Sequence, residues 1–217
     1  MNSLLPVELK EVERKLRVLV ILDSAEAVGL DPLPAVPLHT IAYFTDVLAP
    51  VWNLPVVDGQ MLKRDRPYYP SLQDDIDRLV GQGVVLVNDL QYVRMSRGGW
   101  RAEGNYKLHH QFADRILDVA KGWSSRANEI SFIREVVFAT SGLGLEGIGN
   151  ASAADATYSD PLVDLGGMIE LERGREQNPS ARVALRFGTL LDQAPTLTNA
   201  EMINLYVRQL YARMQVA

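Results

Sequence analysis

The sequence predicts a mainly α-helical fold with a small β-hairpin, which places the chain in the α+β class. Over most of the chain, apolar residues recur at the three-to-four-residue spacing of amphipathic helices. Residues 84–108 differ, because they contain the short apolar and alternating runs that are typical of strands. A helix and a glycine precede them, and helix, glycine, strand, turn, strand is the element order of a winged helix. We therefore predict a winged helix-turn-helix core followed by C-terminal helices.

The composition is that of an ordinary globular protein, with 47% hydrophobic and 23% charged residues among 217. This length suits one sizeable domain or two small ones. We assign N-terminal helices and the winged-helix unit to residues 1–123, and a helical region that packs on them to residues 124–217. The sequence has no cysteine, no apolar signal-peptide core and no run near the roughly 20 apolar residues of a membrane span. We therefore expect a cytoplasmic protein that makes no membrane contact.

Two helices are expected before the hairpin. Residues 7–30 have apolar residues near helical spacing with charged residues opposite, although the β-branched run 18–21 also suits a strand. A proline-rich breaker follows. Residues 38–51 form a strongly amphipathic helix that Pro50 and Pro55 end.

A third helix is expected directly before the hairpin, over residues 71–80. Ser71 with Asp74 is a variant of the capping box, in which a side chain accepts a hydrogen bond from a free backbone N–H of the first turn. Gly81 or Gly83 ends the helix, since glycine readily adopts the left-handed conformation that closes helices.

The strands of the predicted wing follow at once. Residues 84–87 form an apolar strand, Asn88 and Asp89 turn the chain, and residues 90–95 form a second strand. Residues 96–99 are a loop, and residues 105–108 are a third strand.

The rest of the chain is mostly helical. In order, we expect a helix over 109–123, a helix over 127–140 capped by Ser124 and Ser125, a loop or weak helical pair over 142–161, a strand over 168–171, a helix over 181–191, and a helix over 200–214 capped by Thr198 and Glu201. On the first of these helices, Phe112, Ile116, Leu117 and Ala120 share one face.

Two clusters of titratable residues could carry chemistry, and each has a structural interpretation that we favour. His109 and His110 are adjacent at a helix start, so their side chains point about 100° apart and do not face one metal ion. Asp74, Asp75 and Asp77 occupy the first turns of a helix, where the backbone dipole favours negative charge.

A glycine pattern is the remaining candidate for a ligand site. Gly142, Gly144 and Gly147 have the GxGxxG spacing, which binds dinucleotides only after a buried strand and at the start of a helix. Here a helix precedes the glycines, so we interpret them as a connection between helices. We therefore predict no catalytic, cofactor-binding or metal-binding residue, and a protein that is not an enzyme.

Basic residues surround the predicted third helix and continue into the hairpin. Those that could contact a DNA backbone or a partner are Lys63, Arg64, Arg66, Arg94, Arg97 and Arg101. Residues 63–121 hold 10 basic and 8 acidic residues, a balance of +2 against −5 for the whole chain. The third helix carries three aspartates, however, which phosphates would repel. We therefore favour protein docking by this unit, with any DNA contact made to the backbone by the wing.

Four stretches carry a family resemblance: PLHTIAYFTDVLAPVWNLP at 37–55, DGQMLKRDRPYYPSLQDDIDRLVGQGVV at 58–85, FIREVVFATSGL at 132–143 and NPSARVALRF at 178–187. In these stretches the chain resembles the middle components of bacterial ABC-three-component systems, which include relatives of the Lamassu type. The resemblance implies a role in defence against phages and plasmids. It also implies two partners, an SMC- or Rad50-like ABC ATPase that senses DNA and an effector subunit.

The leading hypothesis is therefore a non-enzymatic accessory subunit that bridges the ATPase and the effector. One alternative is a winged-helix transcriptional regulator that binds DNA directly. Another would make the aspartate cluster and the histidine pair a nuclease centre.

Overall fold

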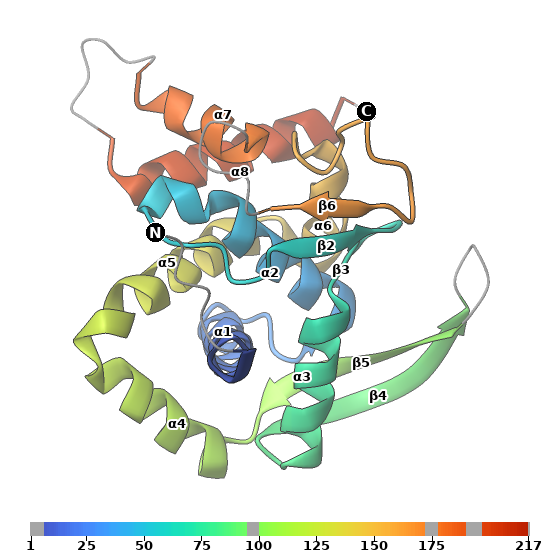
Figure 1. Ribbon diagram of the computed structural model, residues 1–217, viewed down its shortest axis with the longest axis vertical. Coiled ribbons are helices and arrows are strands. Elements are labelled where there is room, and N and C mark those ends of the chain that lie inside the picture. The colour runs from blue at the N-terminus through green and yellow to red at the C-terminus, as the bar shows by residue number, and fades with distance from the viewer. Residues whose placement is uncertain (1–6, 95–99, 172–177, 190–196, 217) are drawn as a thin grey trace.

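The computed structural model describes residues 7–94, 100–171, 178–189 and 197–216, and its helices surround two small antiparallel sheets (Figure 1). The chain is thus mainly helical and of the α+β class, as predicted. Helix α1 (Val7–Ala27) is seen end-on in the figure, with α3, α4 and α5 around it. The β-branched run 18–21 lies inside this helix and is buried, because α1 packs on several other helices.

Helix α2 (Ala35–Leu48) is the centre of the molecule, and nearly all of its residues are buried. Its polar side chains are buried together with its apolar ones, among them His39, Thr45 and Asp46. A short 3-10 helix, η1 (Ala49–Trp52), continues it and contains Pro50, and Asn53 ends it in the left-handed conformation. The predicted amphipathic helix over residues 38–51 is therefore confirmed, but its polar face is not exposed.

The first sheet has the strand order β1-β5-β4 and is antiparallel throughout. Its strands are β1 (Leu33–Pro34), β4 (Val85–Arg94) and β5 (Trp100–Leu108). Strands β4 and β5 form a long hairpin that projects away from the helices (Figure 1). The second strand and the third strand that we expected are parts of β4 and β5, so both lie in this hairpin.

The turn predicted at Asn88 and Asp89 is wrong. Strand β4 runs through both residues, and its register with β5 shifts between Asn88 and Gln91, which marks a β-bulge. Asp89 has a φ of 52°, a conformation that aspartate tolerates better than most residues. A turn signal inside a hairpin strand thus produced a bulge instead of a reversal. Gly104 lies opposite, where a Cβ would stand 2.5 Å from the Val87 side chain.

Helix α3 (Pro70–Gly81) precedes the hairpin as predicted, and Gly83, with a φ of 71°, closes it. The capping box predicted at Ser71 is wrong. The N-cap is Tyr69, and Pro70 occupies the first turn, where its fixed φ and missing N–H suit a helix start. Ser71 lies inside the helix, and its hydroxyl is 3.4 Å from an Asp58 carboxylate oxygen.

The second sheet has the order β3-β2-β6, from β2 (Gln60–Lys63), β3 (Pro67–Tyr68) and β6 (Met168–Glu170). Only β6 was predicted from the sequence. Strands of two to four residues are too short to show an alternating pattern. Their pairing also depends on a segment about a hundred residues away.

The remaining helices cover α1 and α2. They are α4 (His110–Gly122), α5 (Ser124–Ser141), α6 (Gly144–Ala151) with the short 3-10 helix η2 (Ser152–Ala154), α7 (Pro179–Phe187) and α8 (Asn199–Met214). The capping box of Thr198 and Glu201 is confirmed. The cap predicted at Ser124 and Ser125 is wrong, since α5 begins at Ser124 with Trp123 as an N-cap that makes no side-chain hydrogen bond. One core joins the residues before and after position 123.

Candidate partner-binding interface

The exposed face of α3 is narrower than the sequence indicates. Pro70, Asp74, Asp77 and Arg78 are exposed, whereas Gln73 and Asp75 are buried. Asp75 points away from solvent toward α1, where its carboxylate accepts a 2.6 Å hydrogen bond from Arg14 Nε. The expectation of three solvent-facing aspartates is therefore wrong for Asp75, because its partner lies 61 residues away in the sequence.

The charge on this face is negative. Arg78 is the only basic residue of α3, and it pairs with Glu11 of α1 at 2.6 Å. Hydrogen bonds from Lys15 and Arg78 lower the pKa of Glu11, so this carboxylate stays ionised. Asp77 accepts a hydrogen bond from the Gln73 amide, which leaves its charge uncompensated. The exposed carboxylates of this face are therefore Asp74 and Asp77, and the neighbouring Arg78 shares the Glu11 carboxylate with Lys15.

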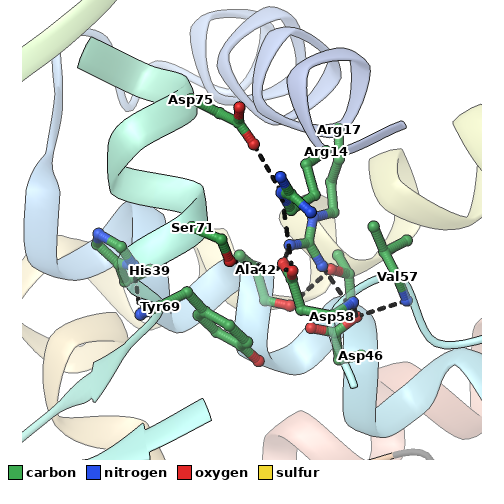
Figure 2. A network of polar contacts seen from close by, with 11 residues as sticks. Arg14, Arg17, His39, Ala42, Asp46, Val57, Asp58, Tyr69, Ser71 and Asp75 are labelled. Atoms are coloured by element: carbon green, nitrogen blue, oxygen red, sulfur yellow. Dashed lines mark hydrogen bonds and ion pairs between the residues drawn. The ribbon is translucent and has the colours of Figure 1, made fainter. Parts of the chain in front are cut away.

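A buried ionic network holds the chain ahead of β2 and α3 in place (Figure 2). Arg17 of α1 is 1% exposed, and its guanidinium donates to Asp46 of α2 at 2.9 Å and to Asp58. The same Asp46 oxygen accepts the backbone N–H of Val57 at 3.1 Å. Since Asp58 also lies 3.4 Å from the Ser71 hydroxyl of α3, the network connects all three helices.

Burial and pairing act against each other in this network. Burial lowers the pKa of Arg17, but the attraction of Asp46 and Asp58 outweighs it and the pKa rises. Burial raises the pKa of Asp46 to about 6, although Arg17 opposes that rise. At neutral pH we expect both Arg17 and Asp46 to be charged. A carboxylate that accepts hydrogen bonds from a guanidinium and from backbone N–H groups is stabilised in its charged form.

His39 of α2 orients the start of α3. It is buried, and its Nδ1 lies 3.3 Å from the backbone N of Tyr69, which has only a hydrogen to offer. Nδ1 is therefore the acceptor, so Nε2 carries the proton and donates to the Gln73 amide oxygen at 3.0 Å. Figure 2 shows His39 on the side of α3 away from Arg14, next to Tyr69 at the start of the helix. This histidine is structural, and it explains why Gln73 is not on the exposed face.

Three of the basic residues singled out from the sequence lie in and after β2. Lys63 is buried, and its ammonium donates to the carbonyl oxygens of Asp160 at 2.6 Å and Val163 at 2.7 Å. It therefore supports the loop before β6 and does not reach solvent. The Arg64 guanidinium lies 4.2 Å from the centre of the Tyr68 ring, and Arg66 donates to Asn150. These two are half-buried.

The other three basic residues belong to the hairpin. Arg94 is exposed near the end of β4 and pairs in register with Trp100. Arg101 pairs with Val93, so the positions of Arg94 and Arg101 lie on opposite faces of the hairpin. Arg97 lies outside the described residues.

The two adjacent histidines contact different partners. The ring of His109 is half-buried, with Nδ1 2.8 Å from the carbonyl oxygen of Gly83. His110 is exposed and lies between Asp114 and Glu26, whose hydrogen bonds raise its pKa. Within the described residues, no group of three histidine, cysteine, aspartate or glutamate side chains is arranged to hold a metal ion.

The glycine pattern connects two helices, as predicted. Gly142 follows α5, Gly144 begins α6 with a φ of 67°, and Gly147 lies inside α6. No strand precedes it, because the residues before Gly142 are helical. The structural context of a dinucleotide-binding loop is therefore missing at this place.

An open groove of about 770 Å³ runs beside the N-terminus of α3. Its lining contains both charges, Lys10 and Arg14 together with Asp58 and Glu170, and Arg14 Nε lies 3.9 Å from an Asp58 oxygen. A groove that binds a nucleic-acid backbone is lined by an excess of basic residues. The described lining of this groove has no such excess.

Sequence reasoning missed an apolar surface on α4. Leu117 and Ala120 of the predicted face are buried, but Phe112 and Ile116 of the same face are exposed. The helix therefore has two adjacent apolar faces, of which only one is covered.

Comparison with known proteins finds no relative. No protein-family model matches the chain, and no curated protein and no solved structure matches it. No helix in the described part of the chain is both long enough and apolar enough to cross a membrane.

Proposed function

We propose that the residues from α1 to β5 are a winged helix-turn-helix unit. Two features support this: the element order α1-β1-α2-α3-β4-β5 and the strand order β1-β5-β4. In such a unit α3 takes the recognition position and the β4–β5 hairpin is the wing. Strands β2 and β3 are then an insertion between the second and third helices, and β6, which follows α6 in the chain, completes their sheet.

We propose that this unit docks onto a protein instead of reading a base sequence. The observation that carries the proposal is the exposed face of α3, where Asp74 and Asp77 stand beside an arginine already paired with Glu11. A helix that enters the major groove runs between two rows of phosphates, and carboxylates there are repelled. A basic surface on a partner protein would be attracted by the same charges.

We propose further that the chain is a non-enzymatic accessory subunit. It would link an SMC- or Rad50-like ABC ATPase, which senses DNA, to an effector in bacterial defence against phages or plasmids. The family resemblance supports this role, and its four stretches fall on α2 with η1, on β2 to β4, on α5 and on α7. These elements carry much of the buried core.

The proposal is tested by co-expressing the tagged full chain with the ATPase and effector encoded beside it. The wild-type chain is expected to co-purify with the ATPase. The double variant Asp74→Lys with Asp77→Lys is expected to bind at least about tenfold more weakly, since it reverses the docking charges. Glu146→Lys, an exposed reversal on α6, is the matched control. Absence of co-purification in every nucleotide state would falsify the proposed function.

A DNA-binding transcriptional regulator is the second candidate, and Arg94 with Arg101 on the hairpin favours it. It requires that the isolated chain bind duplex DNA with a strong dependence on salt. Arg94→Glu with Arg101→Glu would then abolish binding. If the wild-type chain binds no duplex even at low salt, this candidate is excluded.

A further inference from the structure

Helix α4 carries a continuous apolar stripe on its exposed side. Phe112 is 47% exposed, Ile116 40%, Val119 60% and Trp123, directly after the helix, 58%. The intervals between them are four, three and four residues, which is the spacing of the apolar seam in a coiled coil. Single exposed apolar residues are ordinary on a protein surface, but a stripe with this spacing is typical of a helix-binding face.

The stripe is separate from the face that joins α4 to the body. That second face consists of Ala113, Leu117 and Ala120, all of which are buried. Successive residues are rotated by about 100° in an α-helix, so the stripe is centred about a quarter turn from the buried face. The apolar character of the stripe is therefore not explained by intramolecular packing.

Helix α1 extends the stripe into a corner. Leu9 is 37% exposed and Val12 57%. Val12 and Asp23 are eleven residues apart, close to three full turns, so they share one face of α1. That face meets α4, because Asp23 lies 3.6 Å from Lys121 and Glu26 lies 3.0 Å from His110, and it also meets α5, where Arg134 donates to Asp23 at 3.1 Å. Leu9 and Val12 therefore lie on the side of α1 that faces α4, beyond the point where the two helices meet.

We propose that this corner, made of Phe112, Ile116, Val119 and Trp123 with Leu9 and Val12, binds one amphipathic helix of a partner protein. The seam spacing requires a helix with apolar residues at the same spacing. The exposed Arg115 borders the stripe on the side away from the buried face. The bound helix is therefore expected to place a glutamate or aspartate there, as flanking charges do in coiled coils.

The projection of α1 argues against a second copy as the occupant. From Asp23 to Leu9 the helix extends about 21 Å past its contact with α4, at 1.5 Å per residue. Two α4 helices that pack on each other are only about 8–10 Å apart. A dimer of this kind would bring a second projecting α1 to the same interface. A single helix, about 10–12 Å across, can instead lie beside α1.

The area of the corner suits one part of a composite interface. A fully buried aromatic side chain contributes about 150–250 Å², so the half-exposed Phe112 and Trp123 offer roughly 200 Å² between them. A stable interface buries about 1,200 Å² or more over both partners. The corner therefore acts together with a second surface, and the acidic face of α3 is the one already assigned. The identity of the bound helix rests on the proposed function, because we assign that helix to a coiled coil of the ATPase.

The test uses the full chain and the ATPase encoded beside it. Ile116→Glu with Val119→Glu is expected to weaken binding about thirtyfold, because it places two carboxylates in an apolar contact. The control is Phe138→Glu on α5, which changes a residue that is 60% exposed elsewhere. Both variants are compared with wild type by thermal unfolding, and neither should unfold earlier, since all three side chains are solvent-exposed. A photo-crosslinking amino acid at position 119 is expected to label a helix with a coiled-coil repeat.

Each other outcome has a defined meaning. Unchanged binding of the double variant, with loss of binding in the α3 variant, overturns the helix site and leaves the proposed function standing. If wild type does not bind the ATPase, the proposed function fails. The crosslink then decides: a label in an amphipathic helix of the effector supports the site, and no label overturns it. A label in a second copy of this chain, with a dimer that dissociates in the double variant, also overturns it.

Discussion

Two regions of the molecule bury carboxylates and compensate them in different ways. Asp46 and Asp58, between α1 and α2, face the guanidinium of Arg17. Asp155, beside α2, α7 and α8, is fully buried and receives only neutral donors within the described part of the chain. These donors are the hydroxyls of Tyr43, Ser180 and Tyr206 and the backbone N–H groups of Thr157 and Tyr158. The position of α3 thus depends on a balance of charge, whereas the C-terminal helices depend on hydrogen-bond geometry.

The difference has a consequence for variants. A buried ion pair that loses one partner leaves an uncompensated charge in a medium of low polarity. A carboxylate with neutral donors shares its stabilisation among several bonds, so that each single donor matters less. A single substitution should therefore lower the stability more in the ionic network. Around Asp155, which we call the neutral hub together with its donors, the loss of one donor should cost only part of the stability.

The largest expected effect follows from removing the guanidinium. Arg17→Met leaves Asp46 and Asp58 buried together, and we expect the free energy of unfolding to fall by about 4 kcal/mol. Chemical denaturation measures it. The double variant Arg17→Met with Asp46→Leu removes a charge from each side and is expected to recover part of the loss. If the double variant is less stable than the single one, charge balance is not what holds this region.

The next effect comes from the neutral hub. Asp155→Asn keeps the shape of the side chain but turns one acceptor into a donor that faces hydroxyls and N–H groups. We expect a loss of about 3 kcal/mol, because buried donors are left without partners. Asp74→Asn, on the exposed face of α3, is the matched control and should be nearly neutral. A loss at Asp155 larger than that of Arg17→Met would reverse the ranking of the two regions.

A smaller effect is expected at Asn178, where two variants distinguish its two hydrogen bonds. Asn178 caps α7, since its side-chain oxygen accepts from Ala181 N at 3.0 Å, and its amide donates to the Val47 carbonyl at 2.9 Å. Asn178→Ala loses both bonds and is expected to cost about 2 kcal/mol. Asn178→Asp keeps the cap and loses only the donor to Val47. Equal losses in the two variants would show that the cap contributes nothing.

The sequence predicts the parts of this fold whose signals are local. The capping box of α8 uses two residues three positions apart, and it is present. The helix α3 and its closing glycine are also where the local pattern places them. The order of the helices and of the long hairpin in the first half follows from such signals, whereas β1, β2 and β3 were not predicted.

Local signals also failed at the caps predicted at Ser71 and Ser124 and at the turn predicted over 88–89. Other failures depend on distant residues. Asp75 was placed on the exposed face because nothing near it in sequence shows that Arg14 would cover it. The sequence pattern placed the exposed Phe112 and Ile116 of α4 on one face with the buried Leu117 and Ala120. Both faces are apolar, and only the packing of neighbouring helices decides which of them is covered. Arg17 did carry a local signal, since it stands within an apolar run where an arginine requires a buried partner.

The last prediction concerns pH and tests the ionic network through Asp46. Burial raises the pKa of Asp46 to about 6 in the folded chain. Its unfolded value is about 3.9, so the folded state binds the proton more tightly and this group adds stability as the pH falls between these values. We expect the stability difference between wild type and Asp46→Asn to change by at most about 1 kcal/mol per pH unit in that window. Above about pH 7 it should be constant. A difference that shrinks in favour of the variant as the pH falls would mean that Arg17 lowers the pKa of Asp46 below its ordinary value, and that the ion pair outweighs the burial of its carboxylate.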